Sequence, residues 1–331
     1  MKNEKLISII APAYNEAEVL PEFVKRCVTV LKSMSGFNYE LVLINDGSKD
    51  STLAVMRKLK KQFPDITIVN LSRNFGKEIA MTAGLSEASG DAMVVIDTDL
   101  QDPPELIPKL VEKWQEGFDT VYAKRKSREG ETWLKKVTAK AFYSFMQNVG
   151  STPIPPDVGD FRLISRRVTD ALLQLPEKHR FMKGLFSWVG FPDAEVEYER
   201  DARFAGETKW NYWKLWNFAI EGFTSFTIAP LKIASYIGFI TAMSAFVYGL
   251  FVLFKAIIWG DSVQGFPTIM VSMLFLGGVQ LLVLGVIGEY LGRAFNEVKQ
   301  RPLYLLESVD RAQSVVSVNA QEKSDFEKRV A

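Results

Sequence analysis

Apolar and polar residues alternate in short blocks over about the first 125 residues of the chain. Apolar runs typical of strands cover Leu6–Ala11, Glu40–Ile44, Ile66–Leu71, Ala92–Ile96 and Thr120–Ala123. Stretches with helical spacing lie between them, at Glu18–Leu31, Thr52–Phe63, Ile79–Ala88 and Leu106–Trp114. Strands that alternate with helices predict an α/β domain with a doubly wound, mostly parallel sheet.

Two long stretches nearer the C-terminus contain no charged residue. They run from Ile233 to Phe254 and from Phe266 to Ile287. Each is long enough to cross a hydrocarbon core of roughly 30 Å as a helix. We therefore predict a two-helix transmembrane hairpin over residues 232–292, with its helices at about 233–254 and 266–288. A pair of buried core helices is the alternative, although a soluble helix of this length usually has a polar face.

Basic residues flank the hairpin at its outer ends: Lys232 before it, and Arg293, Lys299 and Arg301 after it. The link between the two runs contains one lysine and one aspartate, which roughly cancel. The positive-inside rule then places both termini, and the domain that precedes the hairpin, in the cytoplasm. We expect a multi-pass protein of the cytoplasmic (inner) membrane.

Aromatic residues are concentrated just before the hairpin, between Trp210 and Pro230. Such residues favour the boundary between membrane and water, so residues 209–231 are predicted to form interfacial amphipathic helices. An aromatic core helix is the alternative. The catalytic domain would then cover residues 1–208 and a cytoplasmic tail residues 293–331. The polar part of that tail, after Leu306, is expected to be loosely ordered.

The composition limits the kinds of ligand and metal that the chain is expected to bind. The chain has 40 basic and 39 acidic residues, so its net charge gives no sign of nucleic-acid binding. Cys27 and His179 are the sole cysteine and histidine, which disfavours a zinc site. Any metal should be a hard cation with oxygen ligands, such as Mg²⁺ or Mn²⁺. The charged segment Met1–Leu6 lacks an apolar core, so no signal peptide is expected.

Polar side chains follow each of the first four predicted strands, at the edge of the sheet where α/β proteins bind ligands. These strand-end segments are Pro12–Glu16, Asn45–Ser48, Ser72–Gly76 and Asp97–Gln101. No glycine-rich dinucleotide or phosphate loop follows the first strand. A bound nucleotide diphosphate would therefore have to be neutralised by a metal ion.

Asp97 and Asp99 are the strongest local signal. A buried strand that ends in two carboxylates one residue apart concentrates negative charge, which a divalent cation would compensate. Gln101 offers a further oxygen. The alternative is a solvated turn whose acids cap the next helix, which begins near Pro103.

Together these segments resemble glycosyltransferase family 2. The motifs are Pro12–Glu16, Asn45–Asp50, Arg73–Lys77 and Asp97–Glu105. Within the family the chain is most similar to the polyprenyl-phosphate glycosyltransferases, which include dolichol-phosphate mannose synthase and the bactoprenol glucosyltransferases. The resemblance extends to the C-terminal hairpin. The Gln-x-x-Arg-Trp motif of processive members is absent from the sequence, which argues against a polysaccharide synthase.

The resemblance implies a GT-A fold that binds a nucleotide sugar at the strand ends. The implied donor-binding residues are Pro12, Tyr14, Asn15, Glu16, Asp46, Lys77 and Asp97. The implied ligands of Mg²⁺ or Mn²⁺ are Asp99 and Gln101, with Asp97 shared between metal and nucleoside.

The acceptor side is expected to gather cations around a lipid phosphate. Arg125 and Arg128 lie in a basic cluster after the last predicted strand, although a solvated charge run is the alternative. The resemblance implies acceptor-side roles for Asp157 and Asp160, and for Arg203 and Lys209 in a stretch similar to the family's Arg-x-x-Gly-Ser-Lys loop.

The leading hypothesis is an inverting transfer of glucose from UDP-glucose to a polyprenyl phosphate such as undecaprenyl phosphate. A phosphate monoester is largely dianionic at neutral pH, so the use of a general base stays open. GDP-mannose or a UDP-aminosugar such as formamido-arabinose is the alternative donor. A non-catalytic membrane scaffold and a small channel are alternatives of other classes. Gly277, Gly278 and Gly285 on the second apolar run suggest packing between copies in a homo-oligomer.

Overall fold

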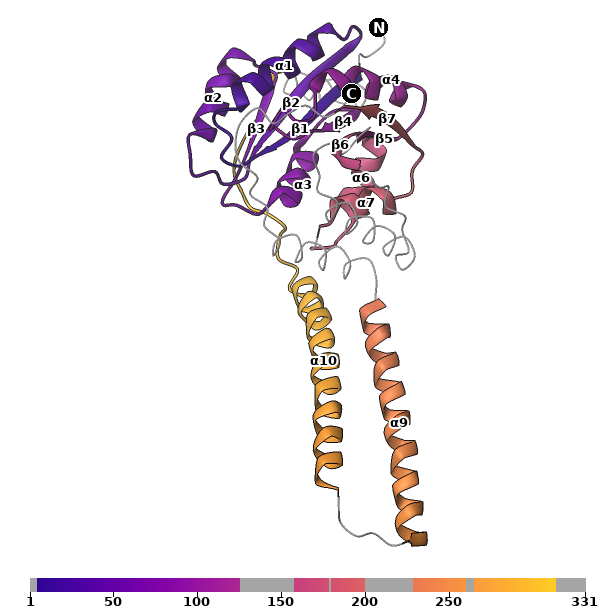
Figure 1. The fold of residues 1–331 in the computed structure, drawn as a ribbon. Coiled ribbons are helices and arrows are strands. Elements are labelled where there is room, and N and C mark those ends of the chain that lie inside the picture. Colours follow the sequence, from indigo (N-terminus) through magenta and orange to yellow (C-terminus); the bar gives the residue numbers. More distant parts are fainter. Residues whose placement is uncertain (1–4, 126–157, 179, 200–228, 260–264, 314–331) are drawn as a thin grey trace, which may run out of the picture. The chain divides into compact units, whose positions relative to one another are not determined.

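The computed structural model describes residues 5–125, 158–178, 180–199, 229–259 and 265–313 (Figure 1). The chain divides into two compact units. The first comprises Met1–Ser144, Thr152–Tyr212 and Arg301–Ala331, and the second comprises Phe145–Ser151 and Trp213–Gln300.

An eight-stranded sheet with the order β7-β5-β6-β4-β1-β2-β3-β8 forms the centre of the first unit. Its strands are β1 (Lys5–Ala13), β2 (Phe37–Asn45), β3 (Ile66–Leu71), β4 (Ala92–Val95), β5 (Thr120–Arg125), β6 (Val158–Ser165), β7 (Asp193–Tyr198) and β8 (Leu306–Asp310). The neighbours β4, β1, β2 and β3 are parallel, as the alternating pattern predicts.

The sheet as a whole is mixed, because β6 lies antiparallel between β4 and β5, and β8 lies antiparallel beside β3. The insertion of β6 has a consequence for the site. Since β6 is antiparallel to both of its neighbours, β4 and β5 point the same way and their carboxyl ends share one edge of the sheet.

Helices cover both faces of the sheet (Figure 1). Their bounds are α1 (Leu20–Ser33), α2 (Thr52–Gln62), α3 (Lys77–Glu87), the short 3₁₀ turn η1 (Pro104–Leu106), α4 (Ile107–Gln115), α6 (Arg166–Gln174) and α7 (Met182–Trp188). Buried residues of α1, α2 and α4 form one cluster with the β1 side chains Ile7, Ile9 and Ala11. α3 and α6 pack on the opposite face, where Gly84 of α3 lies against Ile10 and Ile44.

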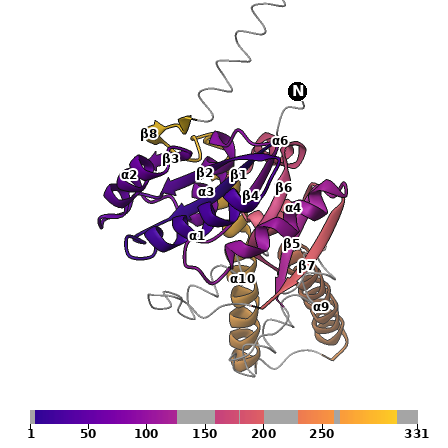
Figure 2. The same cartoon turned by 90° about the horizontal axis from the view of Figure 1, so that it is seen from above.

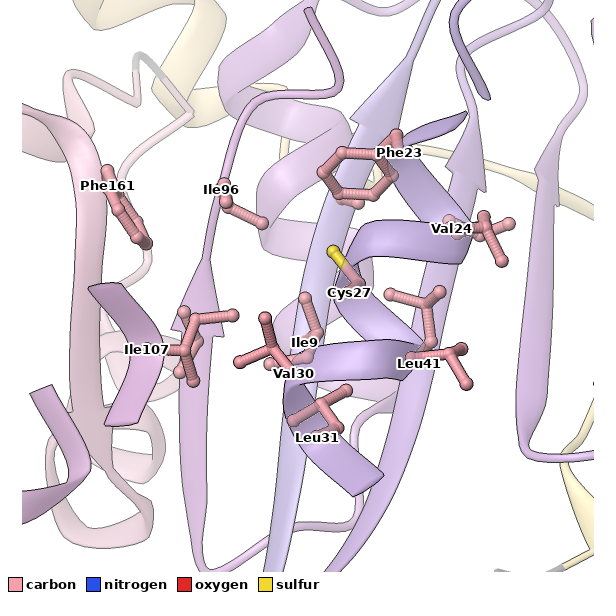
Figure 3. Packing of buried hydrophobic residues seen from close by; sticks show 14 of the residues in the cluster. Ile9, Phe23, Val24, Cys27, Val30, Leu31, Leu41, Ile96, Ile107 and Phe161 are labelled. Carbon is pink, nitrogen blue, oxygen red and sulfur yellow. The ribbon is translucent and has the colours of Figure 1, made fainter. Parts of the chain in front are cut away.

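The packing of α1 shows how apolar spacing forms this core. Cys27 and Val30 of α1 face the strands that carry Ile9 and Leu41 (Figure 3). Burial raises the pKa of the Cys27 thiol, so this cysteine stays protonated and serves as a small core residue.

The C-terminal segment corrects one expectation. Leu306–Asp310 is not loosely ordered: it pairs with β3 as the edge strand β8 (Figure 2). Lys60 of α2 forms an ion pair with Asp310 at 2.7 Å, and Arg311 pairs with Glu87 at 2.6 Å. The backbone N–H of Ala312 donates to the Thr67 hydroxyl at 2.9 Å. These contacts hold the segment on the sheet although its sequence is polar.

The second unit contains two long helices, α9 (Ala229–Trp259) and α10 (Phe266–Val298). They contain the two uncharged runs, and α10 continues beyond the predicted end near residue 288. Among the described residues, Phe275–Val298 is the one stretch long and apolar enough to span a membrane by itself. Ile233–Tyr248 forms a shorter apolar helix within α9. Of the predicted interfacial segment, residues 209–231, residues 209–228 lie outside the described residues, and the last three residues belong to the start of α9.

A buried acid organises the sheet edge opposite the strand-end loops. Glu40 is fully buried and accepts hydrogen bonds from the Ser8 hydroxyl at 2.5 Å and from the Ser89 backbone N–H at 2.6 Å. The Gly90 N–H donates to the same Ser8 hydroxyl at 2.8 Å. A Cβ on Gly90 would lie 2.8 Å from the Ser8 backbone nitrogen and 2.9 Å from the Ala92 carbonyl oxygen. The backbone leaves no room for a side chain there.

We predict that Gly90→Ala destabilises the protein by about 1–3 kcal/mol, because the added methyl must displace backbone atoms of β1 and β4. The matched control, Ser89→Ala, keeps the N–H that Glu40 accepts and should stay within about 0.5 kcal/mol of the parent. Thermal unfolding of the two variants in detergent measures the difference. Equal midpoints would contradict this packing.

Candidate active site

The loops after β1 and β2 bind each other through Asn15 and Ser48. The Asn15 N–H donates to the Ser48 hydroxyl at 3.0 Å, and the Asn15 side-chain oxygen accepts from the Lys49 N–H at 2.8 Å. Asn15 adopts a left-handed conformation with φ 55°, which asparagine tolerates better than most residues. The loop after β1 continues into Glu16, whose N–H donates to the Thr52 hydroxyl at 2.9 Å.

Asp46 fixes the loop after β3. One of its carboxylate oxygens accepts from the Phe75 N–H at 2.7 Å, and the other accepts from the Gly76 N–H and the Asn74 side chain, each at 3.0 Å. Burial raises the pKa of the Asp46 carboxyl, while these donors and nearby Arg73 oppose that rise. The result is that α3 begins at a defined point, with Lys77 as its first residue.

Gly47 allows the two loops to approach this closely. It has φ +61°, and a Cβ on it would lie 2.3–2.4 Å from backbone atoms of Arg73 and Asn74. Only glycine meets both requirements.

The turn after β4 carries the predicted acidic pair. The Asp99 carboxylate accepts from the Gln101 N–H at 3.1 Å. Between them Leu100 has φ 59° and is almost completely buried, a conformation that is costly for a branched side chain. The Thr98 hydroxyl donates to the Pro12 carbonyl at 3.4 Å, which places this turn beside the loop after β1.

Lys77 joins the acidic turn to β6. Its ammonium lies 2.6 Å from Asp97 Oδ1 and 2.5 Å from Asp160 Oδ2. Burial alone would lower the pKa of Lys77, but the two carboxylates outweigh it and raise that pKa. Burial would likewise raise the pKa of Asp160, but Lys77 and Lys183 hold it well below the usual range. Both groups are therefore charged at neutral pH.

Glu78, the residue after Lys77 in α3, is a further acid close to Lys77 and Asp160. Its carboxylate accepts from the Met182 N–H of α7 at 3.3 Å. Burial, with a smaller contribution from the negative charge of Asp160, raises the pKa of Glu78 to about 8 against the opposing effect of Lys77 and Lys183. Glu78 is thus poised to gain or lose a proton near neutral pH.

Arg162 of β6 is buried beside this cluster. Its guanidinium lies 4.0 Å from the centre of the Phe186 ring and donates to the Gly159 carbonyl at 2.8 Å. Burial lowers the pKa of Arg162 to about 10. Asp160 Oδ1 and Arg162 Nε are buried and have no hydrogen-bond partner among the described residues. Asp160 Oδ1 can therefore accept a further hydrogen bond, and Arg162 Nε can donate one.

Arg125, at the end of β5, is positioned by its neighbours. Its Nε donates to the Tyr198 hydroxyl at 3.3 Å, and that hydroxyl donates to the buried carboxylate of Asp102. Gly159 gives the guanidinium room, since a Cβ there would lie 3.2 Å from Arg125 Nη2. Burial alone would lower the pKa of Arg125, but Tyr198 and the nearby acids raise it, so the cation is permanent.

The structure brings the predicted residues together to different degrees. Lys77, Asp97 and Asp160 are in direct contact, and Asn15 and Asp46 build the loops beside them. Arg128, Asp157, Arg203 and Lys209 lie outside the described residues. No sequence pattern predicts Glu78, Tyr198, Lys183 or Arg162 as site residues. Glu78 directly follows the motif Arg73–Lys77, and Arg162 lies two residues after Asp160, but their surroundings are a tertiary feature that no local pattern reveals.

The donor set around the acidic turn suits a hard cation. Asp97, Asp99 and Gln101 offer carboxylate and amide oxygens, the ligand types that Mg²⁺ and Mn²⁺ prefer. Within the described residues no group of three acidic, histidine or cysteine side chains converges as a complete metal cage. A cation here would share its coordination with another ligand, and Asp99 is the better donor because Lys77 already holds Asp97.

Comparison with known proteins agrees with this geometry. The model of glycosyl transferase family 2 matches residues 8–173, which include most of β1, the strands β2 to β6 and the strand-end loops described above. The chain belongs to glycosyl transferase family 2. The GtrB C-terminal hairpin model matches residues 229–294, the region of α9 and α10. This family 2 enzyme is a glycosyltransferase with a GT-A type α/β fold and a mixed sheet.

Several curated relatives match this family 2 chain over nearly its whole length. An uncharacterised glycosyltransferase of Synechocystis, sll0501, is 53% identical over 91% of this chain and 94% of its own length. The prophage bactoprenol glucosyl transferase homolog of Escherichia coli is 47% identical over 92% and 99% of the two chains. The bactoprenol glucosyl transferase of Shigella phage SfII is also 47% identical, over 92% and 98%.

The raised pKa of Glu78 predicts a pH dependence for the family 2 enzyme. Its folded-state pKa of about 8 exceeds the ordinary value of 4.5, so the folded state binds the extra proton. The stability that this proton gives is fully present below about pH 4.5 and is lost as the pH rises to 8. The slope from one such group is at most about 1.4 kcal/mol per pH unit.

Glu78→Gln keeps the size of the side chain but cannot titrate, so its stability should vary less between pH 5 and 8. The exposed control Glu112→Gln should follow the parent curve. Unfolding midpoints of the full-length protein in detergent, recorded across this range, provide the test. Parallel curves for the parent and Glu78→Gln would disprove the assignment.

Proposed function

We propose that this glycosyltransferase transfers glucose from UDP-glucose to a polyprenyl phosphate, such as undecaprenyl phosphate, with inversion at the sugar. Bactoprenol glucosyl transferases and their homologue, with 47% identity, support both the sugar and the lipid acceptor. The bridge from Lys77 to Asp97 and Asp160 is the observation that supports the proposal most directly. It joins Asp97, in the acidic turn on the proposed donor side, to Asp160 of β6, on the proposed acceptor side.

On the donor side, Pro12, Tyr14, Asn15, Glu16 and Asp46 would form the nucleoside pocket with Asp97. Asp99 and Gln101, with one oxygen of Asp97, would hold Mg²⁺ or Mn²⁺. A bound cation would supply positive charge to the leaving nucleotide diphosphate. Asp46 would act largely through the loop that its carboxylate holds, since both of its oxygens already accept hydrogen bonds.

On the acceptor side, Arg125 would bind the lipid phosphate together with Arg128, Arg203 and Lys209. The acceptor is itself the nucleophile and is largely dianionic at neutral pH, so it needs little help from a base. Asp160 is unsuited to that task, because its ion pair with Lys77 keeps it ionised and weakly basic. The chain's own work would be to position two anionic substrates and to balance their charge.

At the membrane, α9 and α10 would form a two-span hairpin. The match to the GtrB C-terminal hairpin supports this topology, and so do the uncharged runs in both helices. Basic residues at the outer ends of the hairpin support a cytoplasmic location for the catalytic domain and both termini. Residues 209–231 would lie in the interface, and Gly277, Gly278 and Gly285 would pack against a second copy.

The decisive experiment incubates membranes with undecaprenyl phosphate and radiolabelled UDP-glucose, GDP-mannose or a UDP-aminosugar, with and without EDTA. We expect label in lipid from UDP-glucose, and its loss with EDTA. Incorporation from another donor would replace the sugar assignment. No incorporation from any donor would favour the membrane scaffold, the alternative without catalysis.

Asp99→Asn should lower transfer by about 10²–10³-fold, because it removes a carboxylate from the turn that faces the diphosphate. The matched control is Asp170→Asn, which neutralises an exposed carboxylate on α6 and should keep parental activity. Turnover is measured with both substrates, and folding is checked by thermal unfolding. Near-normal turnover of folded Asp99→Asn would refute the metal assignment.

Arg125→Gln should raise the KM for lipid phosphate by about tenfold or more, and raise the KM for UDP-glucose much less. Lys124→Gln is the matched control, since the Lys124 ammonium is held by Glu195 at 3.0 Å on the neighbouring strand. The comparison needs initial rates with each substrate varied in turn. A larger effect of Arg125→Gln on the nucleotide sugar would reverse the assignment of the two sides.

A further inference from the structure

The C-terminal strand reaches the donor-side loops through a line of side-chain hydrogen bonds. Glu307 of β8 accepts from the Asn70 side-chain NH₂ at 2.8 Å. The Asn70 side-chain oxygen accepts from the Asn45 NH₂ at 2.7 Å. The Asn45 oxygen in turn accepts from the Ser48 backbone N–H at 3.2 Å. Three neighbouring strands, β8, β3 and β2, are thus linked across the sheet by side chains.

The line ends at the contact between the two donor-side loops. The Ser48 hydroxyl accepts from the Asn15 N–H at 3.0 Å, and Asn15 returns a bond by accepting from the Lys49 N–H at 2.8 Å. The same loop contains Asp46, which holds the start of α3. A shift of the loop after β2 would therefore also shift Asn15, which is hydrogen-bonded to Ser48 and Lys49.

The charge of Glu307 sets the direction of the whole line. An amide side chain has an accepting oxygen and a donating NH₂, and either can be turned toward a neighbour. A carboxylate only accepts, so Asn70 must turn its NH₂ toward Glu307 and its oxygen toward Asn45. Asn45 must then donate to Asn70 and present its oxygen to the Ser48 N–H. Both amides are nearly fully buried, so water cannot satisfy the opposite arrangement.

We propose that Glu307 is a positioning residue for the nucleotide sugar, because it orients the Asn70 and Asn45 amides and through them the loop Asn45–Lys49. The role of that loop in donor binding rests on the proposed function. Glu307 acts through other residues and does not touch the reacting atoms. The strand that follows the hairpin therefore contributes to the donor site.

Glu307→Lys tests the direction of the line. The new ammonium only donates, so Asn70 must turn its oxygen outward and its NH₂ toward Asn45. Asn45 must then turn as well, and the Ser48 N–H loses its acceptor. Loss of one such hydrogen bond should raise the KM for UDP-glucose by about three- to tenfold. The kcat and the KM for lipid phosphate should stay unchanged.

A second substitution should restore the loop without restoring Glu307. In the double variant Glu307→Lys, Asn70→Asp, the new carboxylate accepts from the lysine on one side and from Asn45 on the other. Asn45 then keeps its oxygen on the Ser48 N–H, and the KM for UDP-glucose should return to the parental value. Asn70→Asp alone places two carboxylates side by side and should be impaired.

Asp310→Asn is the matched control. It removes another carboxylate of β8, one that pairs with Lys60 and not with the line to Ser48. It should leave both KM values unchanged even if it loosens the strand. A double variant as impaired as Glu307→Lys would overturn the proposal. So would Glu307→Lys with a parental KM for UDP-glucose, or with both KM values raised equally.

The turnover of the parent protein is measured first. A failure of the proposed function can then be told apart from a failure of the proposed role of Glu307. If the parent transfers no sugar, the proposed function is wrong. The affinity of each variant for UDP, measured by calorimetry, then still reports on the loop. The same ranking of variants in UDP affinity would support the role of Glu307, and equal affinities or no binding would overturn it.

Discussion

The site depends on one ammonium group held between two carboxylates. Lys77 contacts Asp97 from the turn after β4 and Asp160 from β6. Without the cation these two acids would repel each other on adjacent antiparallel strands. The position of Lys77 is itself fixed from β2, because Asp46 holds the loop that begins α3. The loops after β2, β3 and β4 and the strand β6 are therefore coupled through charge.

This arrangement separates two kinds of chemistry along one sheet edge. Oxygen donors gather at the acidic turn, where Asp99 and Gln101 lie, and a guanidinium gathers at the end of β5, where Tyr198 and Asp102 orient Arg125. Lys77 contacts Asp97 of the acidic turn and Asp160, whose sequence neighbour Gly159 lies beside Arg125. A glycosyltransferase that joins two anionic substrates needs positive charge at both, and needs it held rigidly so that it is not screened by mobile water.

The sequence predicts much of the first half of this fold. The run Ala92–Ile96 is recognisable as a strand because a fully buried strand is apolar nearly throughout, and Asp97 and Asp99 stand out because they follow this run. The insertion of β6 between β4 and β5 could not be predicted, since strand order depends on pairing between distant segments. β8 was missed because an exposed edge strand of five residues has too little apolar patterning to recognise. The bridging role of Lys77 and the burial of Arg162 arise only once the chain is folded.

The position of β8 in the sequence has a consequence for biosynthesis. β8 pairs with β3, and Glu307 meets Asn70 across a separation of 237 residues. Both long apolar helices lie between them in the chain, so a ribosome makes them before it makes the last strand. The sheet can be completed only after the hairpin has left the ribosome. The order of translation thereby delays the contact between Glu307 and Asn70 until both long apolar helices have been made.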